Sequence, residues 1–206
     1  APISFKAHRF LFHPYTDESP KQAIVKAAQI GFSTLAILKS FWIANKRKMD
    51  IIYTLPTQED VRVFAGGKIN RLIAQNPILQ TLVKDKDSVE QKAVGDSIIY
   101  YRGTWNSKQA ISHSSDLNIY DEVDSSKQDV VEQYATRLQH SKYKWEWVFS
   151  HPSSTGFGID RYWQKSDQKH WLIKCGEGHE QYLDWPDSIN EEKGIYQCKM
   201  CRIEIM

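Results

Sequence analysis

The sequence predicts an α/β fold in which a mostly parallel sheet carries helices on both faces, followed by a small metal-binding tail. Three observations support this prediction. Short β-type runs alternate with segments of helical spacing, polar residues directly follow several of these runs, and all three cysteines lie in the last 32 residues. Because parallel sheets bind ligands beyond the carboxyl ends of their strands, we expect the functional residues there.

The elements alternate regularly along residues 23–165. β-branched and aromatic runs predict the strands, proline or polar residues end them, and apolar residues at helical spacing predict the helices. The segment 1–22 shows no regular element. The expected strands are 23–25, 49–55, 97–101, 117–120 and 145–150, and the expected helices are 35–46, 58–75, 130–140 and 158–165.

Composition excludes several other classes of protein. With 41% hydrophobic and 25% charged residues, the 206-residue chain suits one medium domain with a small appendage, and not a disordered or fibrous protein. The most apolar stretch, 27–44, contains Gln29 and Lys39 and follows no signal-peptide pattern, so we expect no membrane partner. A net charge of +2 argues against a uniformly basic nucleic-acid binder, although local basic runs could contact phosphates.

Residues 26–34 match a phosphate-binding loop in part. Such a loop reads Gly-x-x-x-x-Gly-Lys-Ser/Thr, and its backbone N–H groups and the following helix bind phosphates. Aligning Gly31 with the second glycine puts Ser33 at the hydroxyl position, Phe32 at the usual lysine and Lys26 at the first glycine. The lysine is thus relocated. An ordinary strand-to-helix turn with an exposed lysine is the alternative for this segment alone.

A pair of carboxylates follows a later strand. The run 117–120 leads directly into Asp121 and Glu122, an arrangement of the Walker B type. Phosphoryl transfer uses one carboxylate to hold Mg²⁺ and a second to activate the attacking water. A solvated acidic turn is the alternative, but it is less natural directly after a buried strand. One strand further on, Ser150, His151 and Pro152 end another β run, where translocating ATPases often sense the γ-phosphate; a simple strand-terminating turn is the alternative.

The tail, 169–206, predicts a structural zinc site. Cys175 and His179 form one short chelating pair, and Cys198 and Cys201 form a second. Together they complete a tetrahedral shell of three thiolates and one imidazole, which leaves no open position for catalysis. Free buried thiols, or a disulfide between Cys198 and Cys201, are the alternatives.

In combination, these motifs resemble the large terminase subunit of tailed, lambda-like double-stranded DNA phages over roughly residues 20–206. The resemblance is carried by the loop 26–33 with its early lysine, the segment 53–57, the acidic run 121–124, the segment 150–152 and the cysteine tail, in the family's order. It implies a RecA-like P-loop ATPase motor domain over 1–168 and a zinc ribbon over 169–206. A nuclease domain is expected downstream, so DNA cleavage is not expected of this chain. The family usually has two cysteine pairs, and His179 departs from that pattern.

The resemblance also implies roles for individual residues. Lys26 contacts the phosphates of ATP, Ser33 helps to hold Mg²⁺, Asp121 is the magnesium carboxylate, Glu122 activates water, and residues 150–152 couple hydrolysis to movement. Because the segment before Asp121 lacks the family's frequent arginine, Arg137 and Arg102 are the candidate substitutes, and Tyr15 is the candidate for stacking on adenine. The full set of expected nucleotide-binding residues is Tyr15, Lys26, Ala27, Ala28, Gln29, Ile30, Gly31, Phe32, Ser33, Thr34 and Asp121.

The expected function is therefore ATP-driven translocation of double-stranded DNA into a capsid. The expected cofactors are ATP, Mg²⁺ and Zn²⁺. The expected partners are DNA, the portal protein, the small terminase subunit and further copies of the chain in a ring, in the host cytoplasm while docked on the procapsid. Two alternatives stay open: a helicase-like DNA-dependent ATPase, and a non-enzymatic zinc-ribbon module that binds DNA or protein.

Overall fold

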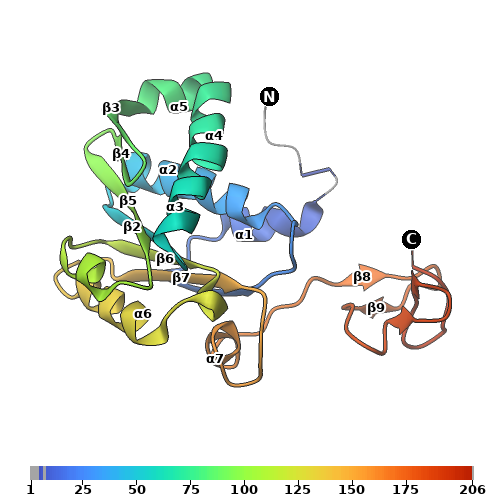
Figure 1. The fold of residues 1–206 in the computed structure, drawn as a ribbon. Helices are drawn as coiled ribbons and strands as arrows, with labels where there is room; N and C mark the ends of the chain where they lie inside the picture. Colours follow the sequence, from blue (N-terminus) through green and yellow to red (C-terminus); the bar gives the residue numbers. More distant parts are fainter. Residues whose placement is uncertain (1–4, 7, 206) are drawn as a thin grey trace. The chain divides into compact units, whose positions relative to one another are not determined.

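A seven-stranded sheet forms the centre of the first of two units into which the chain divides, Ala1–Ser166 and Asp167–Met206. The computed structural model describes residues 5–6 and 8–205. The strand order is β1-β7-β6-β2-β5-β4-β3 (Figure 1); the first five strands pair in parallel, and β4 pairs antiparallel with both β5 and β3. The strands are β1 Lys21–Val25, β2 Ile51–Leu55, β3 Val83–Ser88, β4 Gln91–Val94, β5 Ser97–Gly103, β6 Leu117–Asp121 and β7 Trp145–Ser150.

Helices connect the parallel strands. The α-helices are α1 Phe12–Thr16, α2 Phe32–Arg47, α3 Gln58–Phe64, α4 Asn70–Gln75, α5 Pro77–Leu82, α6 Gln128–Ala135 and α7 Ile159–Trp163. The 3₁₀ helices are η1 Arg9–Leu11, η3 Ser107–Ile111, η4 Val123–Ser125 and η5 Thr136–Leu138, and a π-helical turn, η2, covers Ala65–Ile69. No helix in the described part of the chain has the length and apolar character needed to cross a membrane.

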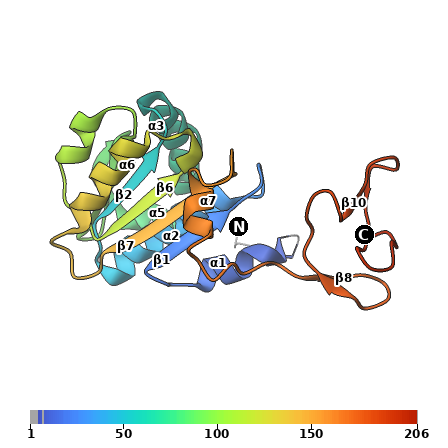
Figure 2. The same cartoon turned by 90° about the horizontal axis from the view of Figure 1, so that it is seen from below.

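The two faces of the sheet are covered by different helices, as expected for buried parallel strands. Ile51, Tyr53 and Leu55 of β2 point into a large apolar core with α2 and α3, whereas Ile52 points into a second core with α6 and α7. Figure 2 shows the helices on the two faces. The alternation along β2 explains why all five of its residues are buried.

The predicted helix 58–75 is three consecutive helical segments. Thr57 is the N-cap of the first segment: its side chain accepts a hydrogen bond from the Asp60 amide, and its own amide donates to the Asp60 carboxylate, which together form a capping box. The π-helical turn then interrupts the helix at the pair Gly66 and Gly67, where glycine lowers helix propensity. The structure also adds α1, α5 and the antiparallel strands β3 and β4, which the sequence pattern did not predict.

The second unit contains two small antiparallel sheets. Strand β8 (Ile173–Lys174) pairs with β9 (Glu180–Gln181), and β10 (Ile189–Asn190) pairs with β11 (Ile195–Tyr196). Each strand has only two residues, so the unit has little regular structure and a small apolar interior.

Candidate active site

The carboxyl ends of three neighbouring strands, β1, β7 and β6, bring the predicted functional residues together. In the parallel register Val25 pairs with Ser150, and Phe149 pairs with Asp121. The residues that follow the strands, Lys26 and Glu122, therefore meet at one edge although they are 96 positions apart. Two backbone hydrogen bonds extend the register past the strand ends: the Lys26 amide donates to the Ser150 carbonyl, and the Glu122 amide donates to the Phe149 carbonyl, both at 2.9 Å.

Lys26 contacts both predicted catalytic carboxylates. Its Nζ lies 2.9 Å from Oδ1 of Asp121 and 2.6 Å from Oε1 of Glu122. The side chains of Lys26 and Asp121 are 7% and 1% exposed, so this ion pair is shielded from water, whereas Glu122 is 34% exposed. Burial lowers the pKa of Lys26, but the negative charge of Asp121 and the hydrogen bonds to both carboxylates outweigh it, so the pKa is raised overall. Lys26 is therefore an ammonium group throughout the neutral range.

Tyr53 is a member of the site that sequence reasoning missed. Its hydroxyl, on the buried strand β2, donates a 2.8 Å hydrogen bond to Oδ2 of Asp121. Burial, and then the charge of Asp121, raise the pKa of Tyr53 well above its usual value, so the hydroxyl stays protonated and can only donate to the carboxylate. Asp121 is thus held on one oxygen by Lys26 and on the other by Tyr53.

Glu122 has the left-handed backbone conformation, with φ 58°. This conformation is uncommon for a residue with a side chain, and such residues concentrate at functional sites. The Oε2 atom accepts a 3.4 Å hydrogen bond from the Ser150 hydroxyl and lies 3.5 Å from Nδ1 of His151. Two of the predicted coupling residues therefore contact the predicted catalytic base, while Pro152 follows in the exposed segment after β7.

The predicted phosphate loop lies between Lys26 and the start of α2. Residues 27–29 are exposed, and positive φ angles at Gln29 (58°) and Gly31 (83°) turn the chain into the helix. Gly31 is the N-cap of α2 and offers no side chain to its first amides. Backbone N–H groups at the start of a helix bind anions, so this loop has the geometry of a phosphate site. Ser33 and Thr34 lie in the first turn of α2.

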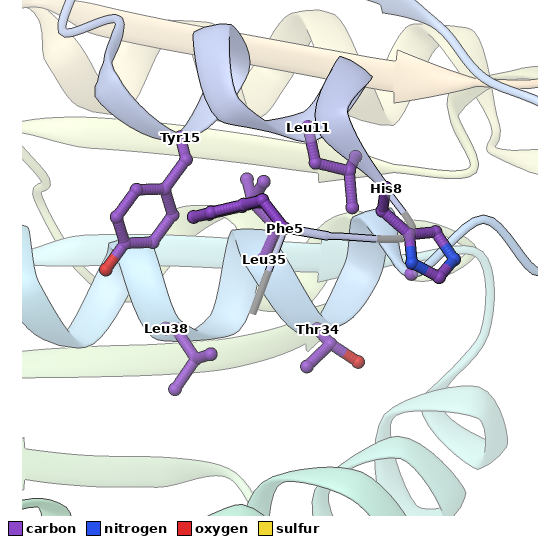
Figure 3. A pocket seen from close by; sticks show the side chains of 8 residues that line it. Phe5, His8, Leu11, Tyr15, Thr34, Leu35 and Leu38 are labelled. Carbon is purple, nitrogen blue, oxygen red and sulfur yellow. The ribbon is translucent and has the colours of Figure 1, made fainter. Parts of the chain in front are cut away.

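An apolar pocket of about 210 Å³ lies beside this loop. Figure 3 shows Tyr15 and Leu11 from the N-terminal segment opposite Leu35 and Leu38 of α2. Pockets that enclose a whole drug-sized ligand measure roughly 300–1,000 Å³, so this one suits a single ring system. Three of the predicted nucleotide-binding residues, Tyr15, Gly31 and Thr34, line this pocket; Phe5 and His8 complete its lining and were not predicted.

The structure does not bring either candidate arginine to the site of its own chain. The carbonyl of Arg137 accepts a hydrogen bond from the amide of Ser115, just before the amino end of β6, whereas Asp121 is at the carboxyl end. Arg102 is buried on β5, and its guanidinium donates to the carbonyls of Glu90 and Tyr101. The role of Arg137 or Arg102 as the substitute for the missing arginine stays a prediction.

The four predicted metal ligands of the second unit converge. Their ligand atoms all lie within 4.8 Å of one another. The Sγ of Cys175 is 3.5 Å from Nδ1 of His179 and 3.8 Å from Sγ of Cys201, and the Sγ of Cys198 is 3.7 Å from the same imidazole nitrogen. In tetrahedral zinc sites, metal–ligand lengths imply about 3.8 Å between thiolates and about 3.5 Å between a thiolate and an imidazole nitrogen. The donor set and its spacing therefore fit Zn²⁺.

The sheet, the phosphate-type loop and the Asp-Glu pair define a nucleoside triphosphatase of the P-loop class. Comparison with protein families is more specific: residues 15–206 match the model described as "Phage terminase large subunit gpA, ATPase domain". The chain belongs to this family, which confirms the predicted family, the mostly parallel α/β fold and the ATP hydrolase class.

Solved structures show the same fold at low sequence identity. The large terminase of bacteriophage HK97 is 14% identical with a TM-score of 0.60, over 73% of this chain and 33% of that one. The large terminase ATPase domain of Thermus phage P74-26 is 11% identical with a TM-score of 0.62, over 89% of this chain and 78% of that one. This chain thus spans about a third of the HK97 protein. No curated protein matches the sequence.

Proposed function

We propose that this chain is the motor part of a phage large terminase subunit and couples ATP hydrolysis to the translocation of double-stranded DNA into a capsid. The observation that carries the proposal is the meeting of Lys26, Asp121 and Glu122 beside the exposed loop at the start of α2. Membership of the large terminase ATPase domain family supports the same function.

In the proposed mechanism, residues 26–34 bind the phosphates through backbone N–H groups and the Lys26 ammonium, which exchanges part of its carboxylate contacts for phosphate oxygens. Asp121 and Ser33 would hold Mg²⁺, which neutralises the charge that develops on the phosphates when it is bound. Glu122 accepts the proton of the attacking water. The pocket lined by Tyr15 receives the adenine ring.

Coupling is proposed to begin at Ser150 and His151. Both contact Oε2 of Glu122. If that carboxylate moves when nucleotide binds, the position of the segment after β7 would therefore change with it. The second unit is proposed to be a zinc ribbon, in which Cys175, His179, Cys198 and Cys201 hold one structural Zn²⁺. Portal protein, small terminase subunit and further copies of the chain in a ring are the proposed partners, on a procapsid in the host cytoplasm.

The test measures ATP turnover by the purified chain as duplex DNA is added. A packaging motor passes every sequence, so stimulation by DNA is expected to be independent of base sequence and to fall steeply with salt, because binding depends on phosphate contacts. Strong preference for one short duplex that persists at high salt, without ATP binding, would instead favour a non-enzymatic zinc-ribbon module. Equal stimulation by single strands, with duplex unwinding, would favour a helicase-like ATPase.

A further inference from the structure

Asp124 ties the turn that carries Glu122 to the chain segment after β7. One oxygen, Oδ2, accepts hydrogen bonds from the Ser153 amide at 2.8 Å and the Ser153 hydroxyl at 2.7 Å. The other, Oδ1, accepts from the Ile159 amide at 2.7 Å. A single side chain thus satisfies three donors on a segment 29–35 positions away.

Two features of the segment after β7 allow it to bind the Asp124 carboxylate: an amide at the start of α7 and a glycine just before it. Ile159 is the first residue of α7, and the N-cap residue Gly158 has no side chain to bond the helix amides, so Asp124 supplies the missing acceptor. Gly158 has φ 51° and ψ −126°, a conformation that essentially only glycine adopts, and a Cβ there would overlap the Asp124 carboxylate. The close approach of these two residues therefore depends on glycine.

A continuous chain of contacts joins Asp124 to Glu122. The Ser150 hydroxyl lies 3.4 Å from Oε2 of Glu122 and also 3.4 Å from the Asp124 amide, which donates to it. Both acidic residues belong to one short turn, in which the Ser125 amide donates to the Glu122 carbonyl. A shift of Glu122 would therefore move the Ser150 hydroxyl and the Asp124 backbone together.

We propose that Asp124 is a positioning residue that transmits the position of Glu122 to the segment 153–163. This inference rests on the proposed function, since it presumes that Glu122 responds to ATP. The relay runs from Glu122 through Ser150 and the shared turn to Asp124, and from its carboxylate to the start of α7, the last helix before the second unit begins at Asp167. In this proposal Asp124 acts through these protein contacts and not directly on the nucleotide or the attacking water.

The test compares the full chain with its Asp124→Ala variant by hydrogen–deuterium exchange, with and without Mg²⁺ and a non-hydrolysable ATP analogue. In the unaltered chain, nucleotide is expected to protect 26–35 and to change the exchange of 151–163. In Asp124→Ala, protection of 26–35 is retained while the response of 151–163 is lost. In steady-state turnover, kcat falls about tenfold and KM changes less than about twofold, because only a step after binding is affected.

Three further variants sharpen the result. Asp129→Ala removes an exposed carboxylate on the neighbouring helix and is expected to behave like the unaltered chain. Ser153→Ala removes only the hydroxyl bond and keeps the amide bond, so its effect is small. Asp124→Asn keeps the shape but turns an N–H toward the donors on one side, so its response and kcat are intermediate; it also carries the test if Asp124→Ala does not fold.

The outcomes separate this inference from the function on which it rests. If Asp124→Ala and Asp124→Asn retain the response of 151–163 and a kcat within about twofold of the unaltered chain, the positioning role is wrong and the ATPase assignment stands. Absence of nucleotide protection at 26–35 in the unaltered chain would contradict the proposed function and this inference together.

Discussion

The ammonium of Lys26 lies 2.6 Å from Oε1 of Glu122, so the relocated lysine of the phosphate loop contacts the predicted catalytic base directly. The same ammonium is 2.9 Å from Asp121, which is almost fully buried. Lys26 thus contacts two adjacent carboxylates at one end of the sheet and offsets one of their two negative charges. Its removal should affect both the stability of the site and the binding of phosphate.

Lys26→Ala is expected to weaken Mg-ATP binding by about 10–100-fold, since a charge-assisted hydrogen bond contributes about 1.5–3 kcal/mol. It should also lower the free energy of unfolding by about 3 kcal/mol, because Asp121 is left buried without its cation. Calorimetric titration and denaturant unfolding measure the two effects. Lys46→Ala, an exposed lysine near the end of α2, is the control. Unchanged ATP affinity in Lys26→Ala would contradict the relocated-lysine interpretation.

Two buried tyrosines give a matched pair for testing how Asp121 is held. Tyr53 and Tyr101 are neighbours in the register of β2 and β5, but only Tyr53 bonds Asp121; within the described residues the Tyr101 hydroxyl has no hydrogen-bond partner. Tyr53→Phe should lower the free energy of unfolding by about 1.5–3 kcal/mol and raise the Mg²⁺ concentration needed for turnover. Tyr101→Phe should be neutral or stabilising. Equal effects of the two changes would mean that the bond to Asp121 is unimportant.

Lys39 should give the stability a characteristic pH dependence. It lies buried on α2, donates to the carbonyls of Pro14 and Asp17, and sits 4.4 Å from the centre of the Trp147 ring. Burial lowers its pKa from 10.5 to about 8, despite the opposing charges of Asp17 and Glu18.

The sign of this effect follows from proton binding. Between pH 8 and 10.5 the unfolded chain binds a proton at Lys39 that the folded chain has released, so this residue makes stability rise with pH in that window. Lys39→Met should remove the rise. Unfolding free energies of both proteins at pH 7.5, 8.5 and 9.5 measure the difference in slope. Parallel curves over this range would contradict the lowered pKa.

Removing zinc should unfold the second unit without unfolding the first. A ribbon of about 40 residues buries little apolar area, whereas structural zinc contributes on the order of 10 kcal/mol to folding. Elemental analysis is expected to find one zinc per chain. A chelator, or Cys198→Ser, should unfold the region from about residue 171 onward and leave ATP binding largely intact. Metal-free protein with an unchanged melting profile would rule out the site.

The sequence predicted the strands that carry the site because their patterns are local. β1, β2, β6 and β7 are apolar runs ended by polar residues or proline, and the positions 26, 121, 122 and 150 follow from those ends. β3 and its partner β4 were not predicted, because the sequence of β3, VKDKDS, is as polar as an exposed loop. Its strand character depends on pairing with β4, which is not a local property.

The contacts of Tyr53, Asp124 and Lys39 were not predicted because they join distant segments. Tyr53 resembles an ordinary core residue until β2 is known to lie beside β6, which places its hydroxyl at Asp121. Asp124 was visible only as part of an acidic run, and its partners lie beyond the next strand. Lys39 interrupted an apolar stretch, but the carbonyls that receive it belong to a segment without a predicted element.

Comparing Mg-ATP binding and turnover in the unaltered chain and its Glu122→Gln variant tests whether Glu122 is the base of an ATP-hydrolysing site. The amide keeps the shape of the side chain but cannot accept the proton of water. ATP affinity is expected to stay within about twofold and turnover to fall by about 10²–10⁴-fold. Turnover in Glu122→Gln equal to that of the unaltered chain would mean that Glu122 is not the base.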